Sequence, residues 1–165
     1  MGIALLFVSV LFLTYCMIFL PSGSAKHLWV AVGILIFALI AGSLILNDAN
    51  HFGMKQVTET SQQTLYSSTP GGKKEIIYHS LGNGQEKIYY YRTSPNQKKL
   101  YQTNPATTTV TVKRNHSDRL TVQKKFWVYH SGFAKFYFAG GQPDHQLISQ
   151  RLTFHLQKAW QVVEK

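Results

Sequence analysis

The sequence predicts a membrane-anchored fold, in which an N-terminal two-helix transmembrane hairpin precedes a small, mostly-β (α+β) antiparallel domain with a short C-terminal helix. Two uncharged apolar runs near the N-terminus predict the hairpin. The composition changes sharply near Asn47, and runs rich in β-branched and aromatic residues follow. We therefore divide the 165 residues into the hairpin at 1–46, a connector at 47–72 and a basic strand-rich domain at 73–165.

The apolar runs cover residues 3–20 and 28–46, and neither contains a charged residue. As helices they would be roughly 27 to 28 Å long, close to the hydrocarbon core of about 30 Å. An isolated span in lipid must be helical, because helix satisfies its backbone hydrogen bonds internally. Pro21 and Gly23 separate the runs, and Trp29 is placed to anchor at the headgroup level. Ala38 and Gly42 have the spacing of a close helix contact.

Two other interpretations of this region are a cleaved signal peptide and a pair of buried soluble helices. Small residues at 23–25 resemble a cleavage site, but no basic residue precedes the first run. That run is also longer than the usual signal core of about 7 to 15 residues. The remaining chain is too small to bury both runs in a soluble core. We therefore predict an uncleaved two-pass protein of the cell membrane with both termini on the same side.

The orientation of the hairpin depends on the positive residues that flank it. Lys26 in the loop is balanced by Lys55 after the second run. Lys73 and Lys74 lie further out, and a basic domain suits the anionic cytoplasmic leaflet. We therefore favour a cytoplasmic domain, with an outward-facing domain against an anionic wall as the alternative.

The connector is rich in Thr, Ser and Gln, with short strands expected at 54–58 and 63–67, and it closes at Pro70, Gly71 and Gly72. Beyond it, strands at 76–80 and 87–92 flank Asn83 and Gly84. An Asn-Gly pair between such runs predicts a β-hairpin.

A second hairpin is expected from strands at 107–113 and 120–130, joined through residues 115–118. Period-two spacing places Leu120, Val122, Phe126 and Val128 on one face of the second strand. Residues 133–139 are predicted as a further strand, which the glycines at 140 and 141 end.

The C-terminal segment has two interpretations, which give different architectures. Asp144 could cap a helix that continues to Val163 with one apolar face. Alternatively the helix ends near Leu152, and residues 153–156 and 160–163 are extended. We favour the second.

Residues 84–91, 124–129 and 153–160, together with the apolar hairpin, resemble a family of uncharacterised small membrane proteins of lactobacilli, a domain of unknown function (DUF4811). The family has Pro at the position of Gln157, which favours an extended tail. The shared residues are packing and turn residues. The resemblance therefore implies a bacterial envelope protein and brings no activity with it.

No residue pattern in the sequence is typical of a catalytic, metal or cofactor site. The single cysteine, Cys16, lies in the first apolar run, and the seven histidines have no metal-binding spacing. Asp118 is explained as a turn residue and Asp144 as a helix cap. We predict no enzyme and no cofactor. A membrane-tethered enzyme that uses His79 and His130 is the competing class.

The excess of positive charge gives the functional hypothesis. Of the 17 Lys and Arg residues, only Lys26 lies in the first 46 positions. We expect an accessory or binding module that acts on a partner membrane protein or on anionic lipid or wall polymer. Single-stranded nucleic acid at Tyr89–Tyr91 is a less favoured partner. The candidate contact residues are Lys73, Lys74, Lys98, Lys99, Lys113, Arg114, Arg119, Lys124 and Lys125.

Overall fold

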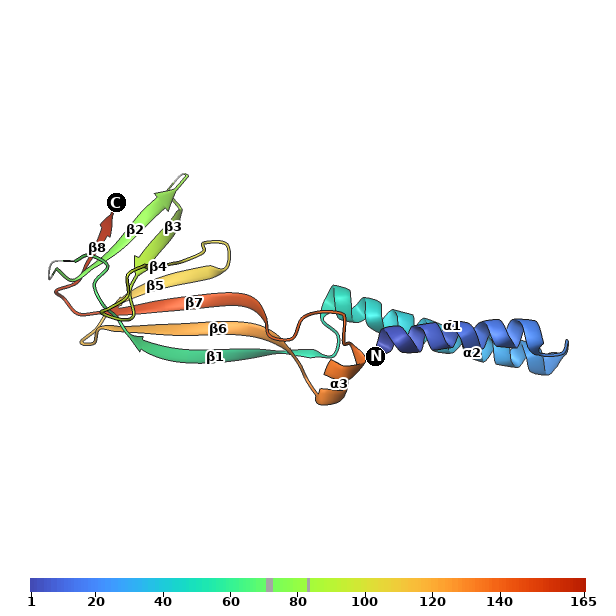
Figure 1. Ribbon diagram of the computed structural model, residues 1–165. Helices are drawn as coiled ribbons and strands as arrows, with labels where there is room; N and C mark the ends of the chain where they lie inside the picture. Colours follow the sequence, from blue (N-terminus) through green and yellow to red (C-terminus); the bar gives the residue numbers. More distant parts are fainter. Residues whose placement is uncertain (71–72, 83) are drawn as a thin grey trace. The chain divides into compact units, whose positions relative to one another are not determined.

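The computed structural model describes residues 1–70, 73–82 and 84–165, and confirms the predicted class of two long apolar helices followed by a mostly-β region with one short helix (Figure 1). The chain forms two compact units, Met1–Val57 with Trp127–Gln146, and Thr58–Phe126 with Leu147–Lys165. The boundaries at residues 46 and 72 stay a prediction. The elements are α1 (Gly2–Phe19), α2 (Ser24–Asn50), β1 (Met54–Thr64), β2 (Glu75–Leu81), β3 (Glu86–Tyr91), β4 (Tyr101–Gln102), β5 (Thr108–Arg114), β6 (Arg119–Tyr129), α3 (Gly132–Tyr137), β7 (Gln146–Leu156) and β8 (Gln161–Glu164).

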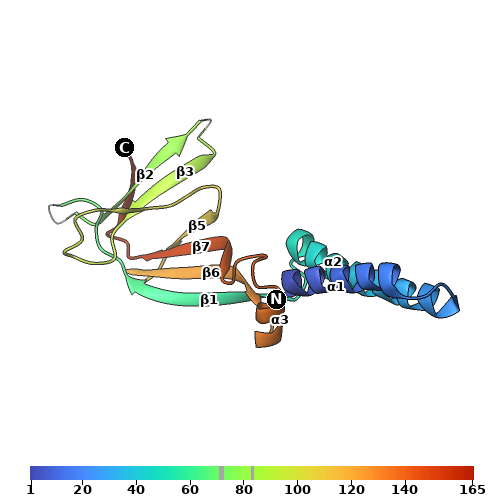
Figure 2. The same cartoon turned by 45° about the vertical axis from the view of Figure 1, so that its right-hand side comes forward.

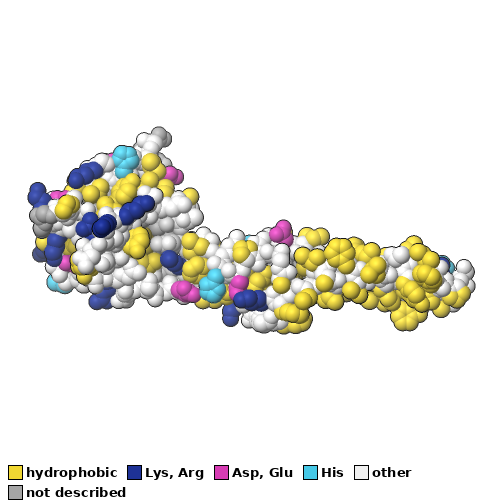
Figure 3. All heavy atoms as spheres, viewed as in Figure 1, with side chains coloured by type: hydrophobic (Ala, Val, Ile, Leu, Met, Phe, Trp, Pro, Cys, Tyr) yellow, Lys and Arg dark blue, Asp and Glu magenta, His cyan; other side chains and the backbone are white. Residues whose placement is uncertain are grey.

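Helices α1 and α2 lie side by side as a hairpin (Figure 2). Both are long and apolar enough to cross a membrane. Helix α2 extends past the apolar run to Asn50 and is capped by His51, whose φ of 55° is left-handed. In the most apolar 18-residue stretch of each helix, only 17% of the stretch in α1 and 6% of the stretch in α2 are buried. Their apolar side chains therefore face outward, as Figure 3 shows.

The close approach of the two helices occurs at Gly33. A Cβ there would lie 2.8 Å from Cδ1 of Leu13. The contact predicted at Ala38 and Gly42 is wrong, because Ala38 is exposed and a Cβ on Gly42 would meet no atom within 4 Å. Small residues are present both at Gly33 and at the Ala38–Gly42 pair. The face of α2 that carries Gly33 meets α1, whereas the other pair does not.

Within the described residues, the strands form two four-stranded sheets, with the orders β1-β6-β7-β5 and β4-β3-β2-β8. The predicted hairpin of β2 and β3 is confirmed, with Ile77 opposite Tyr90 and Leu81 opposite Glu86. Asn83 of its turn, like Gly71 and Gly72, lies outside the described residues. Both sheets also contain a parallel pair, β5 with β7 and β2 with β8.

The second unit has its own hydrophobic core. Phe154, Leu152 and Leu156 of β7 are fully buried and alternate along the strand. On the predicted face of β6, Leu120 and Val122 are buried in this core and Phe126 is partly buried, whereas Val128, also buried, belongs to the first unit. The core cluster consists of Leu65, Ile76, Tyr91, Leu120, Val122, Leu152, Phe154, Leu156 and Trp160.

The predicted hairpin between residues 107–113 and 120–130 is wrong, although both strands exist. Strand β6 lies between β1 and β7, and β5 pairs with β7 instead. The turn residues at 115–118 allow a reversal of the chain. The parallel partner of β5, however, comes from a segment far along the chain, whose alternating apolar residues complete the core.

Three other local predictions require correction. Residues 133–139 form helix α3 and its end instead of a strand, because Ser131 caps the helix by accepting a hydrogen bond from the N–H of Ala134. The segment after Asp144 is strand β7 instead of a helix, whereas the extended forms expected at 153–156 and 160–163 are confirmed in the main by β7 and β8. The two short strands expected at 54–58 and 63–67 are replaced by the single strand β1.

Candidate functional site

In the first unit, the start of α1, the end of α2 and helix α3 meet at what we call the helix junction, formed by Met1, Gly2, Ser43, Leu44 and Tyr137. The ammonium group of Met1 donates to the carbonyl oxygens of Phe136 (3.0 Å) and Tyr137 (3.3 Å). A Cβ on Gly2 would lie 2.9 Å from Leu44 and 3.0 Å from the Tyr137 carbonyl oxygen. Glycine fits this approach without displacing either neighbour, and α3 is held at the level of the first turn of α1.

A pair of hydroxyl groups joins α2 to α3 within the helix junction. The Oγ of Ser43 lies 2.8 Å from the carbonyl oxygen of Ile40 and 2.9 Å from the hydroxyl of Tyr137. The carbonyl can only accept, so the Ser43 proton goes to Ile40 and the Tyr137 hydroxyl donates to Ser43. Both hydroxyl protons are therefore used inside the apolar surroundings.

The turn after α2 packs against the end of α3. The side-chain amide of Asn47 donates to the carbonyl oxygen of Phe52 at 2.7 Å. Gly53 has a φ of 82°, and a Cβ there would lie 2.7 Å from the Phe138 ring. The Phe52 and Phe138 rings meet edge to face, with centroids 6.2 Å apart. Backbone freedom and lack of a side chain are thus both required at Gly53.

Helix α3 exposes two aromatic rings, Phe133 (76% exposed) and Phe136 (58%). Its single basic residue, Lys135, forms an ion pair with Asp144 at 2.9 Å. The carboxylate of Asp144 also accepts from the backbone N–H of Tyr129. The hydrogen bond from Lys135, followed by that from Tyr129, holds the pKa of Asp144 below its usual value.

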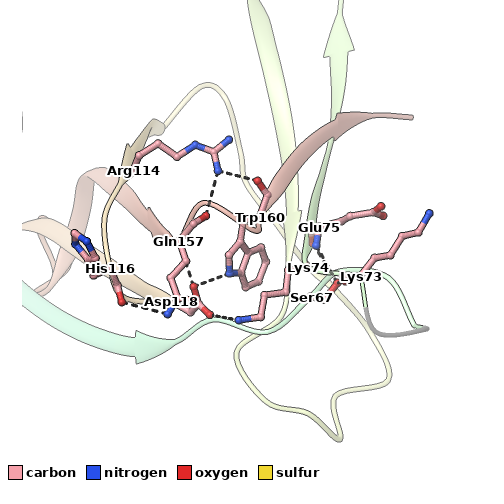
Figure 4. A network of polar contacts seen from close by, with 9 residues as sticks. All are labelled: Ser67, Lys73, Lys74, Glu75, Arg114, His116, Asp118, Gln157 and Trp160. Carbon is pink, nitrogen blue, oxygen red and sulfur yellow. Dashed lines mark hydrogen bonds and ion pairs between the residues drawn. The ribbon is translucent and has the colours of Figure 1, made fainter.

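In the second unit, the polar contacts centre on Asp118 (Figure 4). Its carboxylate accepts from Lys74 Nζ at 2.6 Å, from Trp160 Nε1 at 2.6 Å and from the Gln157 backbone N–H at 3.3 Å. Arg114 donates to the carbonyl oxygens of Gln157 and Trp160 at 3.3 and 2.7 Å. We call these five residues the Asp118 network. It ties the loop before β6 to the loop before β8.

Burial raises the pKa of Asp118, but the hydrogen bonds from Lys74, Gln157 and Trp160 together outweigh it and lower the pKa below the usual value. Asp118 is therefore held as a carboxylate in a fold-stabilising position. Its role is larger than that of the turn residue predicted from the sequence.

All nine predicted basic contact residues are exposed. Lys74 and Arg114 belong to the Asp118 network, and Arg119 donates to the side-chain oxygen of Gln62 at 2.7 Å. The others lie in β-strands or loops of the second unit, and Figure 3 shows Lys and Arg side chains on that unit. Trp29, near the start of α2, is half exposed and meets Phe12 edge to face.

The histidines proposed for an enzyme have separate local partners. His79 Nδ1 lies 2.6 Å from the Lys165 carbonyl oxygen, and His130 Nδ1 lies 3.1 Å from that of Gly53. They belong to different units. Among residues 1–70, 73–82 and 84–165, no group of three or more His, Cys, Asp or Glu residues could hold a metal ion.

The tyrosines considered for base stacking pack against the core. The Tyr89 and Tyr91 rings lie 6.0 and 5.6 Å from the ring of Phe154. Core packing therefore accounts for the aromatic character of this strand.

Sequence reasoning missed the helix junction and α3. Three signals were present: Ser131 as an N-cap, helical spacing of Phe133, Phe136 and Tyr137, and Gly2 at the start of the first helix. The same aromatic residues also fit a strand, because aromatic side chains are enriched in strands as well.

Fold and site together define a protein with an apolar two-helix hairpin, a short aromatic helix bonded to the base of that hairpin, and a strand-rich unit. The chain belongs to the family described as a domain of unknown function (DUF4811), whose model matches residues 24–165. That match includes α2 and every later element. The chain matches no curated protein and no solved structure.

Proposed function

We propose that this protein is a membrane-anchored binding module, in which α1 and α2 cross the bilayer and the basic unit binds an anionic surface. The observation that supports this proposal best is the outward-facing apolar surface of both helices, whose most apolar stretches are only 17% and 6% buried. The core helix of a soluble protein would bury such a surface. A bilayer covers it at no cost to the strand-rich unit, which has its own core.

Helix α3 adds an interfacial element to this anchor. Its hydrogen bonds to Met1 hold it beside the end of the apolar segment, where a membrane has its aromatic belt. The exposed Phe133 and Phe136 would enter the acyl-chain boundary, and the Lys135–Asp144 pair would stay in the headgroup layer. Trp29 would anchor the opposite side.

The basic residues of the second unit would supply the binding surface. Lys98, Lys99, Lys113, Lys124 and Lys125 are exposed, and each Lys near an anionic surface contributes about 1 kcal/mol. We propose a cytoplasmic location and anionic lipid as the ligand. Neither the sequence nor the described residues motivate an enzymatic role, and a partner membrane protein is the second candidate ligand.

Topology is tested with single cysteines in full-length protein in intact cells. In a Cys16→Ser background, Ser22→Cys marks the α1–α2 loop and Ser94→Cys marks the strand-rich unit, and both serines are exposed. A membrane-impermeant maleimide should label only the loop cysteine, and both after permeabilisation. Labelling of only the Ser94→Cys variant would reverse the orientation. Labelling of both variants in intact cells would contradict the two-pass hairpin.

Binding is tested with full-length protein in neutral-lipid nanodiscs mixed with separate vesicles that contain phosphatidylglycerol. Co-flotation should fall with salt and with the substitution of Lys98, Lys99, Lys113, Lys124 and Lys125 by Gln. The matched control replaces Lys26, Lys55, Lys87, Lys158 and Lys165 by Gln, which removes the same charge. Equal losses would contradict the assigned residues, and binding that ignores both salt and lipid charge would contradict the lipid proposal.

A further inference from the structure

An apolar cavity of about 550 Å³ lies in the first unit, between α2 and α3. Small-molecule sites commonly have volumes of about 300 to 1,000 Å³. The residues that shape the cavity are mainly apolar and come from α2, the turn after it, the start of β1, and α3. They include Leu39, Ser43, Phe52, Met54, Phe133 and Tyr137.

The polar groups of the cavity have internal partners. The Ser43 hydroxyl donates to the Ile40 carbonyl oxygen, and the Tyr137 hydroxyl donates to Ser43. The Nδ1 of His130 faces the Gly53 carbonyl oxygen, so it carries a proton and donates. A ligand would therefore meet apolar surface in the interior, and only the exposed His130 ring offers a further polar atom.

Leu39 (65% exposed) and Phe133 (76% exposed) are the most exposed of the large apolar lining residues, which places the opening of the cavity beside them. Leu39 precedes Leu46, the end of the apolar run, by seven residues, which is about 10 Å along the helix. The opening thus lies within the segment that the proposed function places in the bilayer. Lipid tails would face this opening.

The walls are preformed by close contacts. Gly53 packs against the Phe138 ring, and the Tyr137 and Phe138 rings meet edge to face at 4.8 Å. The wall on α2 runs only from Leu39 to Ser43, about 6 to 7 Å of helix. A helix with side chains is about 10 to 12 Å wide, so the cavity suits a narrow alkyl chain better than a partner helix.

From the lining, the position of the mouth and the width, we infer that the cavity between α2 and α3 binds one acyl chain of a bilayer phospholipid. This inference rests on the proposed membrane insertion. We assign lipid as the occupant because the apolar walls continue into the outward-facing surface of α2, where Leu35 and Ile36 are also exposed. The headgroup would lie toward His130.

The test is photocrosslinking of the full-length protein in liposomes that contain a phospholipid with a diazirine in its acyl chain. Mass spectrometry should find adducts on Met54 and on the segment from Phe133 to Tyr137. Leu39→Trp, which fills the mouth, should remove these adducts. Leu35→Trp is the matched control, since Leu35 is 59% exposed one turn away and lies outside the cavity lining. It should retain them.

The possible failures are distinguishable. Adducts on the outer faces of α1 and α2 without adducts in the cavity would overturn the inference and leave the membrane proposal intact. If neither α1 nor α2 forms adducts, the acyl-chain inference and the proposed membrane insertion would both be overturned. Crosslinks from the cavity to a second protein chain would also overturn the inference. If Leu39→Trp does not fold, a headgroup diazirine on the wild-type protein decides the question, because stronger cavity labelling from the headgroup than from the acyl chain would contradict acyl-chain binding.

Discussion

The two units of this chain place their apolar residues in opposite ways. In the unit that contains the helices, large apolar side chains such as Leu11, Leu39 and Phe133 are exposed, and Gly2, Gly33 and Gly53 lie where an added Cβ would meet a neighbour at 3.0 Å or less. In the strand-rich unit, Phe154, Leu152 and Leu156 are fully buried. The first arrangement is stable where the solvent is lipid, and the second where it is water.

This difference shows which interactions matter in each unit. In the proposed bilayer, lipid would compete with apolar contacts between helices, so close backbone approach and hydrogen bonds would become important. Gly33, Gly2 and the Ser43–Tyr137 hydroxyl pair fit that description. Water-driven burial dominates the other unit, where Asp118 and Trp160 then fix the loops around the core.

The largest expected effect comes from a matched pair of phenylalanines. Phe154→Ala removes a fully buried ring from the core and should lower the free energy of unfolding by about 3 to 5 kcal/mol. Phe133→Ala removes an exposed ring and should change it by less than about 0.5 kcal/mol. Urea denaturation of the full-length protein in micelles, followed by tryptophan fluorescence, measures both. Similar losses for the two variants would contradict the proposed contrast between the units.

A second comparison uses two glycines with left-handed backbone. Gly53→Ala introduces a Cβ that would lie 2.7 Å from the Phe138 ring, whereas a Cβ on Gly82 would meet no atom within 4 Å. The left-handed conformation costs about 1 to 2 kcal/mol in both variants. Overpacking should add about 1 to 3 kcal/mol at Gly53 alone.

Hydrogen exchange of two amides reports these effects locally. The His130 N–H donates to Gly53, and the Gly84 N–H donates to Leu81 beside Gly82. We expect the His130 amide to lose more protection in Gly53→Ala than the Gly84 amide loses in Gly82→Ala. Equal losses would indicate that backbone strain alone governs both sites.

The third prediction concerns the Asp118 network. Asp118→Asn removes the charge that Lys74 and Trp160 approach at 2.6 Å, and should destabilise the protein by about 1.5 to 3 kcal/mol at neutral pH. The pKa of Asp118 is lowered in the folded state. Its stabilisation is therefore fully present above the usual value of 3.8, and is lost as the pH falls through the lower folded pKa.

Denaturation midpoints between neutral pH and pH 2 test this sign. The wild-type protein should lose stability in that acid window, and Asp118→Asn should lose less. Glu86→Gln, at an exposed carboxylate, is the control and should follow the wild-type curve. Parallel curves for wild type and Asp118→Asn would show that this carboxylate contributes little.

The sequence predicted correctly those elements whose residues follow a single local pattern, either a long apolar run or a period-two alternation. The apolar runs that became α1 and α2 had no competing pattern, and the β2–β3 hairpin had alternating residues on both sides of its turn. The partner of β5 could not be predicted, because parallel pairing with β7 depends on the packing of Leu152 and Phe154 across the core.

The candidate site was harder to predict than the fold. The segment after Asp144 has apolar residues that suit a helix, yet Asp144 accepts from Tyr129 and the following residues pair as β7. The role of Met1 depends on a contact with α3 across 135 residues of sequence. Such contacts follow from tertiary packing, and no local pattern reports them.

The smallest expected effect is that of Lys135→Gln, which breaks the ion pair with Asp144 at the end of α3. The Lys135 side chain is largely exposed, so we expect a loss below about 1 kcal/mol that disappears in high salt. The pKa of Asp144 should rise toward its usual value but stay below it, because the Tyr129 N–H still donates. A carboxyl NMR titration of the full-length protein measures this pKa. An unchanged pKa in Lys135→Gln would show that the backbone donor alone holds the carboxylate. A loss of stability as large as that of Asp118→Asn would mean that α3 depends on its ion pair as strongly as the strand-rich unit depends on the Asp118 network.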